Sequence, residues 1–118
     1  MKVPGPDHPI TVVPNKNRVR VIFAGKTIAD STRALTLTEA SYPDVQYIPR
    51  ADVDMDALKP TAHASHCPYK GDASYFAISA GGNSADNAVW SYERPFPAMA
   101  AIAGYLAFYP HKVEIVQG

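Results

Sequence analysis

Polar and apolar residues alternate with a period of two along most of the chain, which is typical of half-buried β-strands. Residues 18–23 place Val19, Val21 and Phe23 on one face, and Gly25 turns the chain into a second short strand. The pattern therefore predicts an early hairpin. The same alternation predicts further strands at residues 35–38, 45–48, 70–79, 87–93, 105–109 and 112–116.

Two short segments depart from this period and favour helix. Residues 52–58 space Met55 and Leu58 three apart behind aspartates that can cap a helix, and Pro60 prevents its continuation. Residues 97–104 begin with proline and end with glycine, the usual order for a short helix.

Most connections between the predicted strands are too short for parallel crossovers. The sequence therefore predicts a mainly β fold, either an antiparallel sandwich or a small, partly open barrel, with two short helices. Because of these two helices, the fold could also be classed as α+β.

The chain divides into an arm and one globular unit. Residues 1–17 contain four prolines around the short apolar run 10–13, so we expect an extended proline-rich arm that pairs at a sheet edge. Residues 18–118 show no internal repeat and are long enough for one hydrophobic core, so they are predicted to form a single globular β-rich domain.

The charges balance, with 11 Lys and Arg against 11 Asp and Glu, so no basic field favours a nucleic-acid partner. One cysteine cannot close an intramolecular disulfide, and no targeting segment opens the chain, so a soluble, cytoplasmic protein is expected. The weakly polar run 95–110 is shorter than the ~20 apolar residues of a membrane span. We therefore expect no membrane partner.

One motif concentrates chemistry at the entry to a predicted strand. Lys70 lies between Tyr69 and a glycine, where its charge can face an anionic ligand. Trp90 and Tyr92 share one face of the next strand, and Tyr75 joins them if the hairpin register allows. Aromatic side chains with one cation are typical of a small-molecule cleft. An ordinary aromatic core with a lysine reaching to solvent remains an alternative.

Three residues are candidates for catalysis: Cys67, Lys70 and Glu93. Cys67 is a nucleophile only as a thiolate, which Lys70 or His63 would favour if the fold brought either one close. Glu93 would orient a polar part of a substrate. A lone cysteine beside proline is equally explained as a small buried apolar residue, so the sequence leaves open whether the protein is an enzyme.

Metal ligands are sparse. His63, His66 and Cys67 lie within five residues, and on an extended backbone only His63 and Cys67 share a face. Structural zinc takes four protein ligands, often as two separated pairs, and no second pair follows. The sequence therefore predicts no metal and no other cofactor, with His63 and Cys67 as the remaining candidates.

A spaced set of carboxylates, Asp52, Asp54 and Asp56, is of the kind that holds magnesium in nucleotidyl transfer. Acidic residues in a first helical turn also cap the helix and oppose its dipole. No glycine-rich phosphate loop precedes them, which favours the capping interpretation.

Four stretches together resemble a known family. They are residues 47–53, Cys-Pro-Tyr-Lys-Gly at 67–71, Trp-Ser-Tyr-Glu at 90–93 and residues 102–108. Their order and spacing resemble the family of domain of unknown function 427, over residues 18–116. The resemblance implies a small, mainly β, stand-alone soluble domain, sometimes labelled nucleotidyltransferase-like. The residues it carries over are Cys67, Lys70, Tyr75, Trp90, Tyr92 and Glu93.

Three functional hypotheses follow. The first is a domain that binds a small, anionic ligand in a cleft lined by Lys70, Tyr75, Trp90 and Tyr92. The second is a structural module that forms a homo-oligomer through a sheet edge, with the run 10–13 as its support. The third is metal-dependent nucleotidyl transfer through the aspartates around Asp54.

Overall fold

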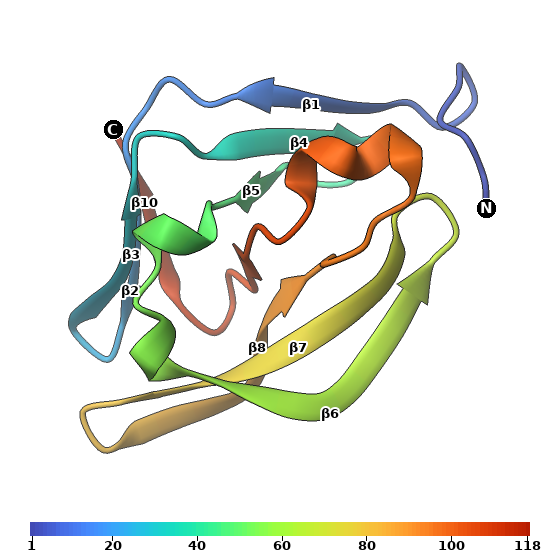
Figure 1. Cartoon of the computed structure of the whole chain (residues 1–118). Helices are drawn as coiled ribbons and strands as arrows, with labels where there is room; N and C mark the ends of the chain where they lie inside the picture. The colour runs from blue at the N-terminus through green and yellow to red at the C-terminus, as the bar shows by residue number, and fades with distance from the viewer.

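The computed structural model describes all 118 residues and contains ten strands in three antiparallel sheets (Figure 1). The strands of the first sheet, in spatial order, are β1 (Ile10–Pro14), β4 (Leu35–Glu39) and β5 (Val45–Tyr47). Those of the second are β10 (Glu114–Gln117), β2 (Val19–Phe23) and β3 (Lys26–Ser31). Those of the third are β6 (Leu58–Cys67), β7 (Gly71–Ala80), β8 (Asn83–Ser91) and β9 (Ala107–Phe108).

The predicted mainly β class is confirmed, and the sheets do not close into a barrel. The helical segments are 3₁₀ turns: η1 (Arg50–Asp52), η2 (Met55–Ala57) and η3 (Pro97–Ile102). Each is too short to complete α-helical hydrogen bonding before the chain leaves for a strand or a turn. No helix of the structure has the length and apolar character needed to cross a membrane.

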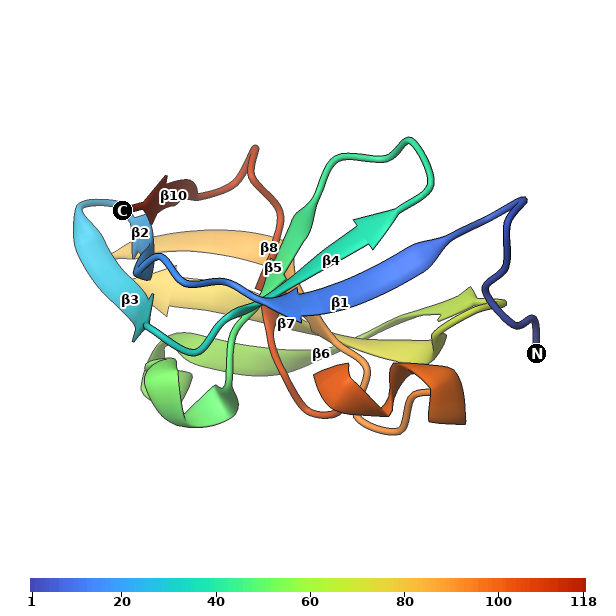
Figure 2. The same cartoon turned by 90° about the horizontal axis from the view of Figure 1, so that it is seen from above.

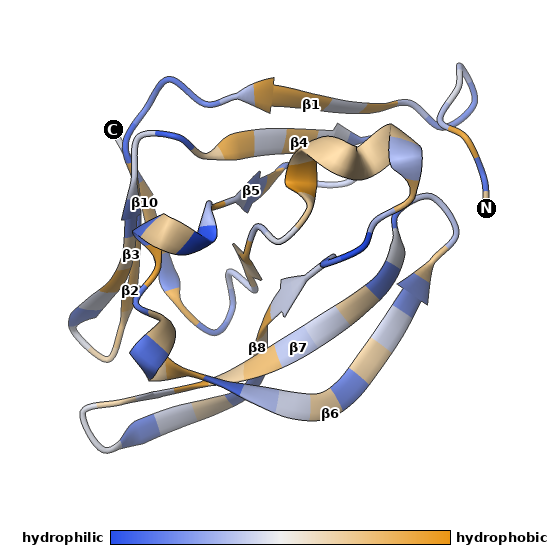
Figure 3. Cartoon of the chain, in the orientation of Figure 1, coloured by the Kyte–Doolittle hydropathy of each residue, from blue (hydrophilic) through white to orange (hydrophobic).

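Strand β6 was not predicted. Nearly all of its residues are exposed and only Leu58 is buried, so the strand has no buried apolar face. Hydrophilic and hydrophobic residues are interspersed along it (Figure 3). It lies at the edge of its sheet, where it pairs with β7 alone. An edge position also tolerates Pro60, whose missing N–H would interrupt pairing inside a sheet.

The N-terminal segment is part of the first sheet. Strand β1 pairs with β4 from Ile10 opposite Glu39 to Pro14 opposite Leu35. Ahead of β1, the Lys2 amide donates to the Pro68 carbonyl over 2.7 Å, which ties the beginning of the chain to the turn between β6 and β7. The predicted boundary between arm and domain stays a prediction.

Two hydrophobic clusters share the long strands β7 and β8. The larger contains 17 buried residues and lies against β2 and β3, and the smaller contains eight and lies beneath β4, β5 and η3 (Figures 1 and 2). Tyr75 and Phe76 are adjacent and both buried, yet Tyr75 belongs to the smaller cluster and Phe76 to the larger. The pairing of β7 with both neighbours shifts register at Phe76. The smaller cluster is rich in tyrosine and contains the candidate site.

Candidate functional site

A cavity of about 180 Å³ lies between the sheet β1-β4-β5 and the sheet β6-β7-β8-β9, and we call it the aromatic cavity. The four residues expected to bind ligand, Lys70, Tyr75, Trp90 and Tyr92, all line it. The complete lining is Leu37, Glu39, Tyr42, Pro43, Val45, Tyr47, Lys70, Tyr75, Trp90, Tyr92 and Tyr109.

Strand pairing positions the aromatic walls. Tyr75 on β7 is the direct cross-strand partner of Trp90 on β8, so their side chains point to the same side of the sheet. Leu37 and Tyr47 face them from β4 and β5, and both are almost completely buried. Alternation along each strand therefore turns these side chains toward the cavity from two opposing sheets.

Lys70 is held in the tight turn that leads into β7. Gly71 has a φ of +108°, which L side chains rarely adopt, and the Phe96 amide donates to the Lys70 carbonyl over 2.9 Å. A Cβ on Gly71 would lie 3.5 Å from the Phe96 nitrogen. That distance is an ordinary van der Waals contact, so the positive φ is the reason that glycine stands at this turn next to Lys70.

The Lys70 ammonium is paired with a carboxylate. Its Nζ donates to Glu39 Oε1, while Glu39 Oε2 lies 2.7 Å from His8 Nε2. The His8 ring in turn stacks on Tyr69, with ring centroids 4.2 Å apart. Burial by itself would raise the pKa of Glu39, but the hydrogen bonds and charges of Lys70 and His8 outweigh it and hold that pKa below its usual value.

The tyrosine walls remain protonated at neutral pH. Burial raises the pKa of Tyr47 and of Tyr92 well above the usual value of 10.0, and it raises the pKa of Tyr109 to about 12. Trp90 Nε1 donates to the Tyr47 hydroxyl over 3.2 Å. Because the hydroxyl oxygen is the acceptor in this bond, the Tyr47 O–H can still donate to another group. The Tyr75 and Tyr109 hydroxyls lie 3.3 Å apart. The cavity is thus a partly open space whose mainly aromatic walls carry O–H groups.

The other predicted candidates lie outside the lining. Cys67 is half-buried, with its Sγ 3.8 Å from Lys70 Nζ. Glu93 is exposed on the surface, where its Oε1 lies 3.8 Å from a terminal guanidinium nitrogen of Arg50. Of the catalytic candidates, only Lys70 lines the aromatic cavity.

The candidate metal ligands have separate partners. His63 is exposed and packs edge-on against the Tyr75 ring, with centroids 4.4 Å apart, while Cys67 faces Lys70. His66 Nδ1 lies 2.7 Å from Asp72 Oδ1. No group of three or more His, Cys, Asp or Glu side chains converges anywhere in the chain.

The aspartates of residues 52–56 are engaged in local structure. Asp52 accepts hydrogen bonds from Arg33 and from Ser31, and the Arg33 hydrogen bond lowers the pKa of that carboxyl. Asp54 accepts from the Asp56 amide at the start of η2 and pairs with Lys26 Nζ at 3.3 Å. Capping and ion pairing account for these contacts.

Sequence reasoning missed Glu39, Tyr47 and Tyr109 as cavity residues. Glu39 shares its strand parity with Leu37, so an acidic side chain at an inward position was the available signal. On β5, Tyr47 has the same strand parity as Val45, so its inward position could have been recognised in the same way. Tyr109 follows β9, whose two residues are too few to show any period.

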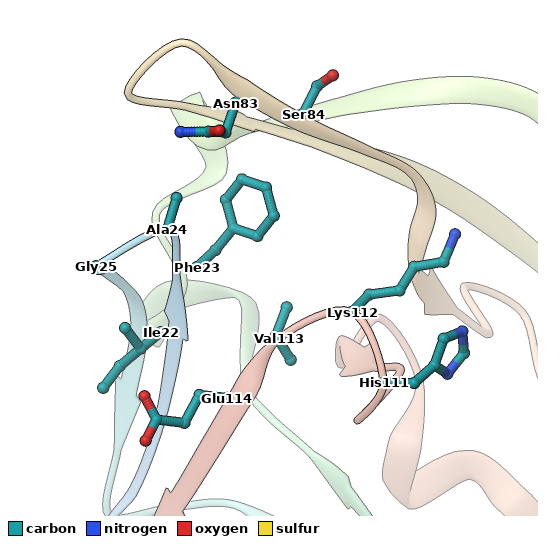
Figure 4. Close-up of a pocket in the computed structure, with 10 residues that line it drawn as sticks. All are labelled: Ile22, Phe23, Ala24, Gly25, Asn83, Ser84, His111, Lys112, Val113 and Glu114. Carbon is teal, nitrogen blue, oxygen red and sulfur yellow. The ribbon is translucent and has the colours of Figure 1, made fainter.

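A larger, open hollow of about 570 Å³ lies between the β2–β3 turn, the β7–β8 turn and the segment before β10 (Figure 4). Glu114 lies on one side and His111 on the other, and Lys112 Nζ donates to the Asp86 carbonyl over 2.5 Å. Its titratable groups do not converge on one point. The more enclosed aromatic cavity is therefore the stronger candidate, although it is smaller.

The fold and this cavity define a small, single-domain, mainly β protein with an ion pair in an aromatic enclosure. A family model described as domain of unknown function (DUF427) matches residues 11–117, and the chain belongs to this family. No curated protein matches the chain.

Proposed function

We propose that this protein binds a small, planar molecule in the aromatic cavity. The observation that carries the proposal is that Lys70, Tyr75, Trp90 and Tyr92 surround one space together with Glu39. Apolar enclosure with a few converging polar groups is the usual construction of a small-molecule site.

The volume sets the size of the ligand. A cavity of roughly 150 Å³ in another protein accommodates benzene, and drug-sized ligands occupy about 300–1,000 Å³. At about 180 Å³, the aromatic cavity suits a single ring with one or two substituents. Flat walls from Tyr75 and Trp90 favour a ring over a branched aliphatic group because π-faces pack best against flat partners.

The ion pair sets the polarity of the ligand. Because Glu39 neutralises Lys70, the site has no uncompensated cation to attract an anion, so we favour a neutral ligand over the anionic one suggested by Lys70 alone. Lys70 retains N–H donors beyond the one given to Glu39, and Glu39 retains acceptor lone pairs. A ring with adjacent N–H and C=O groups would satisfy both.

The test uses Trp90, the chain's single tryptophan, as a fluorescent reporter in the cavity wall. Uracil, a neutral ring with adjacent N–H and C=O groups, should change Trp90 fluorescence saturably, and benzoate, an anion of similar size, should bind at least tenfold more weakly. Val45→Phe, which fills the cavity, should abolish the uracil response. Asn83→Ala in the open hollow should leave it unchanged. A linear response to uracil, or one that Val45→Phe preserves, would overturn the proposal.

A further inference from the structure

A further hollow, distinct from the open hollow of Figure 4, adjoins the aromatic cavity. Neither the sequence analysis nor the proposed function assigns it a role. This hollow, the outer groove, has a volume of about 910 Å³. The residues that line both spaces are Tyr42, Pro43, Val45, Trp90 and Tyr109. The two spaces are therefore neighbours that share these side chains as a common wall.

The boundary follows from the place of β5 in its sheet. Strand β5 is the last strand of β1-β4-β5, so nothing pairs along its outer edge within that sheet. Tyr47 lines the aromatic cavity and Gln46 lines the outer groove, as alternation along a strand requires. The two spaces thus meet at the edge strand of this sheet, where no further strand of the sheet lies between them.

The outer groove is mostly apolar, but it holds a cluster of uncharged polar side chains and carries no net charge. The Asn15 amide nitrogen donates to Gln46 Oε1 over 3.0 Å and to Gln117 Oε1 over 2.9 Å, and Thr36 Oγ1 donates to Gln46 Oε1 over 2.9 Å. Its only charged residues are one lysine and one aspartate. Amides both donate and accept, so they match hydroxyl groups better than phosphate or carboxylate.

We propose that the two spaces form one site for a nucleoside-like molecule, which rests on the proposed function of the cavity. A single ring with adjacent N–H and C=O groups lies in the aromatic cavity, with Lys70 donating to its carbonyl oxygen and Glu39 accepting from its N–H. A neutral, hydroxylated substituent extends past Val45 into the outer groove, where the Gln46 amide nitrogen donates to one hydroxyl. Asn15 Oδ1 accepts from another, because both N–H groups of the Asn15 amide are already engaged.

Hydrogen-bonding capacity supports this assignment. The amide nitrogen of Gln46 remains free to donate because the contacts to Asn15 and Thr36 both use its oxygen. Both Gln46 and Asn15 are half-buried, so their bonds to a ligand are partly shielded from water.

The experiment compares uracil with uridine, which adds a ribose to the same ring, by titrating Trp90 fluorescence. Two added hydrogen bonds correspond to roughly tenfold tighter binding of uridine. Gln46→Ala removes one of the two bonds and should weaken uridine binding by roughly threefold while leaving uracil binding unchanged. Thr36→Val, which preserves side-chain volume but removes the hydroxyl that donates to Gln46 Oε1, should weaken uridine binding in the same direction. Asn83→Ala, in the open hollow, is the matched control. Uridine 5′-monophosphate should bind no more tightly than uridine.

The outcomes separate the two proposals. Uracil binding with no gain for uridine would overturn the two-part site and leave the function of the cavity standing. A uridine gain that neither Gln46→Ala nor Thr36→Val reduces would also overturn the outer groove as its cause. If uracil itself does not bind, both proposals fail together.

Discussion

Lys70 and Glu39 lie 31 residues apart in the sequence and form an ion pair in the wall of the aromatic cavity. Their side chains are only 9% and 15% exposed, so each charge depends on the other for the interactions it loses with water. The pair joins β4 to the turn before β7 and therefore couples the two sheets that enclose the cavity. It contributes to the fold and to the polarity of the site at once.

Replacing Lys70 with methionine tests this dual role. Lys70→Met leaves Glu39 largely buried with His8 as its remaining partner, so we expect the free energy of unfolding to fall by about 2 kcal/mol in urea denaturation. Adding Glu39→Gln should recover part of the loss because it removes the carboxylate that has lost its lysine partner. Lys59→Met, at an exposed lysine, should change stability by less than about 0.5 kcal/mol. Equal effects of Lys70→Met and Lys59→Met would show that the pair is not structural.

The lowered pKa of Glu39 predicts a dependence of stability on acid. A carboxyl whose pKa is lower in the folded than in the unfolded state contributes its full stabilisation above the unfolded value, near 4.5, and loses it as pH falls. Wild-type protein should therefore be more stable than Glu39→Gln at pH 7, with the difference shrinking below about pH 4.5. Urea denaturation between pH 3 and pH 7 measures this. Glu114→Gln, at an exposed carboxylate, should show no such change in its difference from wild type.

The hydrogen bond from Trp90 to the Tyr47 hydroxyl predicts the effect of a conservative substitution. Tyr47→Phe leaves the indole N–H without its acceptor in a half-buried site, which should cost about 1 kcal/mol of stability and shift Trp90 fluorescence emission. Tyr42→Phe is the control because Tyr42 is 63% exposed, and its effect should be within about 0.5 kcal/mol. An unchanged emission maximum in Tyr47→Phe would contradict the contact.

The positive φ of Gly71 predicts that replacing this glycine with alanine destabilises the protein. Gly71→Ala forces a side chain onto a φ of +108° beside the Phe96 backbone, so we expect a loss of roughly 2–3 kcal/mol. Gly82→Ala is the matched control, since its φ of +79° is also positive but its surroundings are open, and its cost should be about 1 kcal/mol. Thermal or urea unfolding of the two variants decides the question. A smaller loss for Gly71→Ala than for Gly82→Ala would refute the larger backbone strain expected at a φ of +108°.

Alternation by itself was enough to predict most strands, because the period of two follows from strand geometry and one buried face. It identified β2, β4 and β7 to within a residue or two. The turn at Gly81-Gly82 predicted the hairpin between β7 and β8, but the sequence left its register open, and only the structure pairs Tyr75 with Trp90. Strand β6 gave no such signal because an exposed edge strand has no buried face to impose a pattern on its residues.

The tertiary structure alone decided which residues complete the cavity. Tyr47 lies 43 residues from Trp90, Tyr109 lies 34 residues from Tyr75, and Glu39 reaches Lys70 from another sheet. No local period encodes such contacts, because they depend on how two sheets pack face to face. The sequence by itself therefore determined the class of fold and four residues of the candidate site. Sheet packing decided that Lys70 is neutralised by Glu39, because only folding brings β4 against the turn before β7.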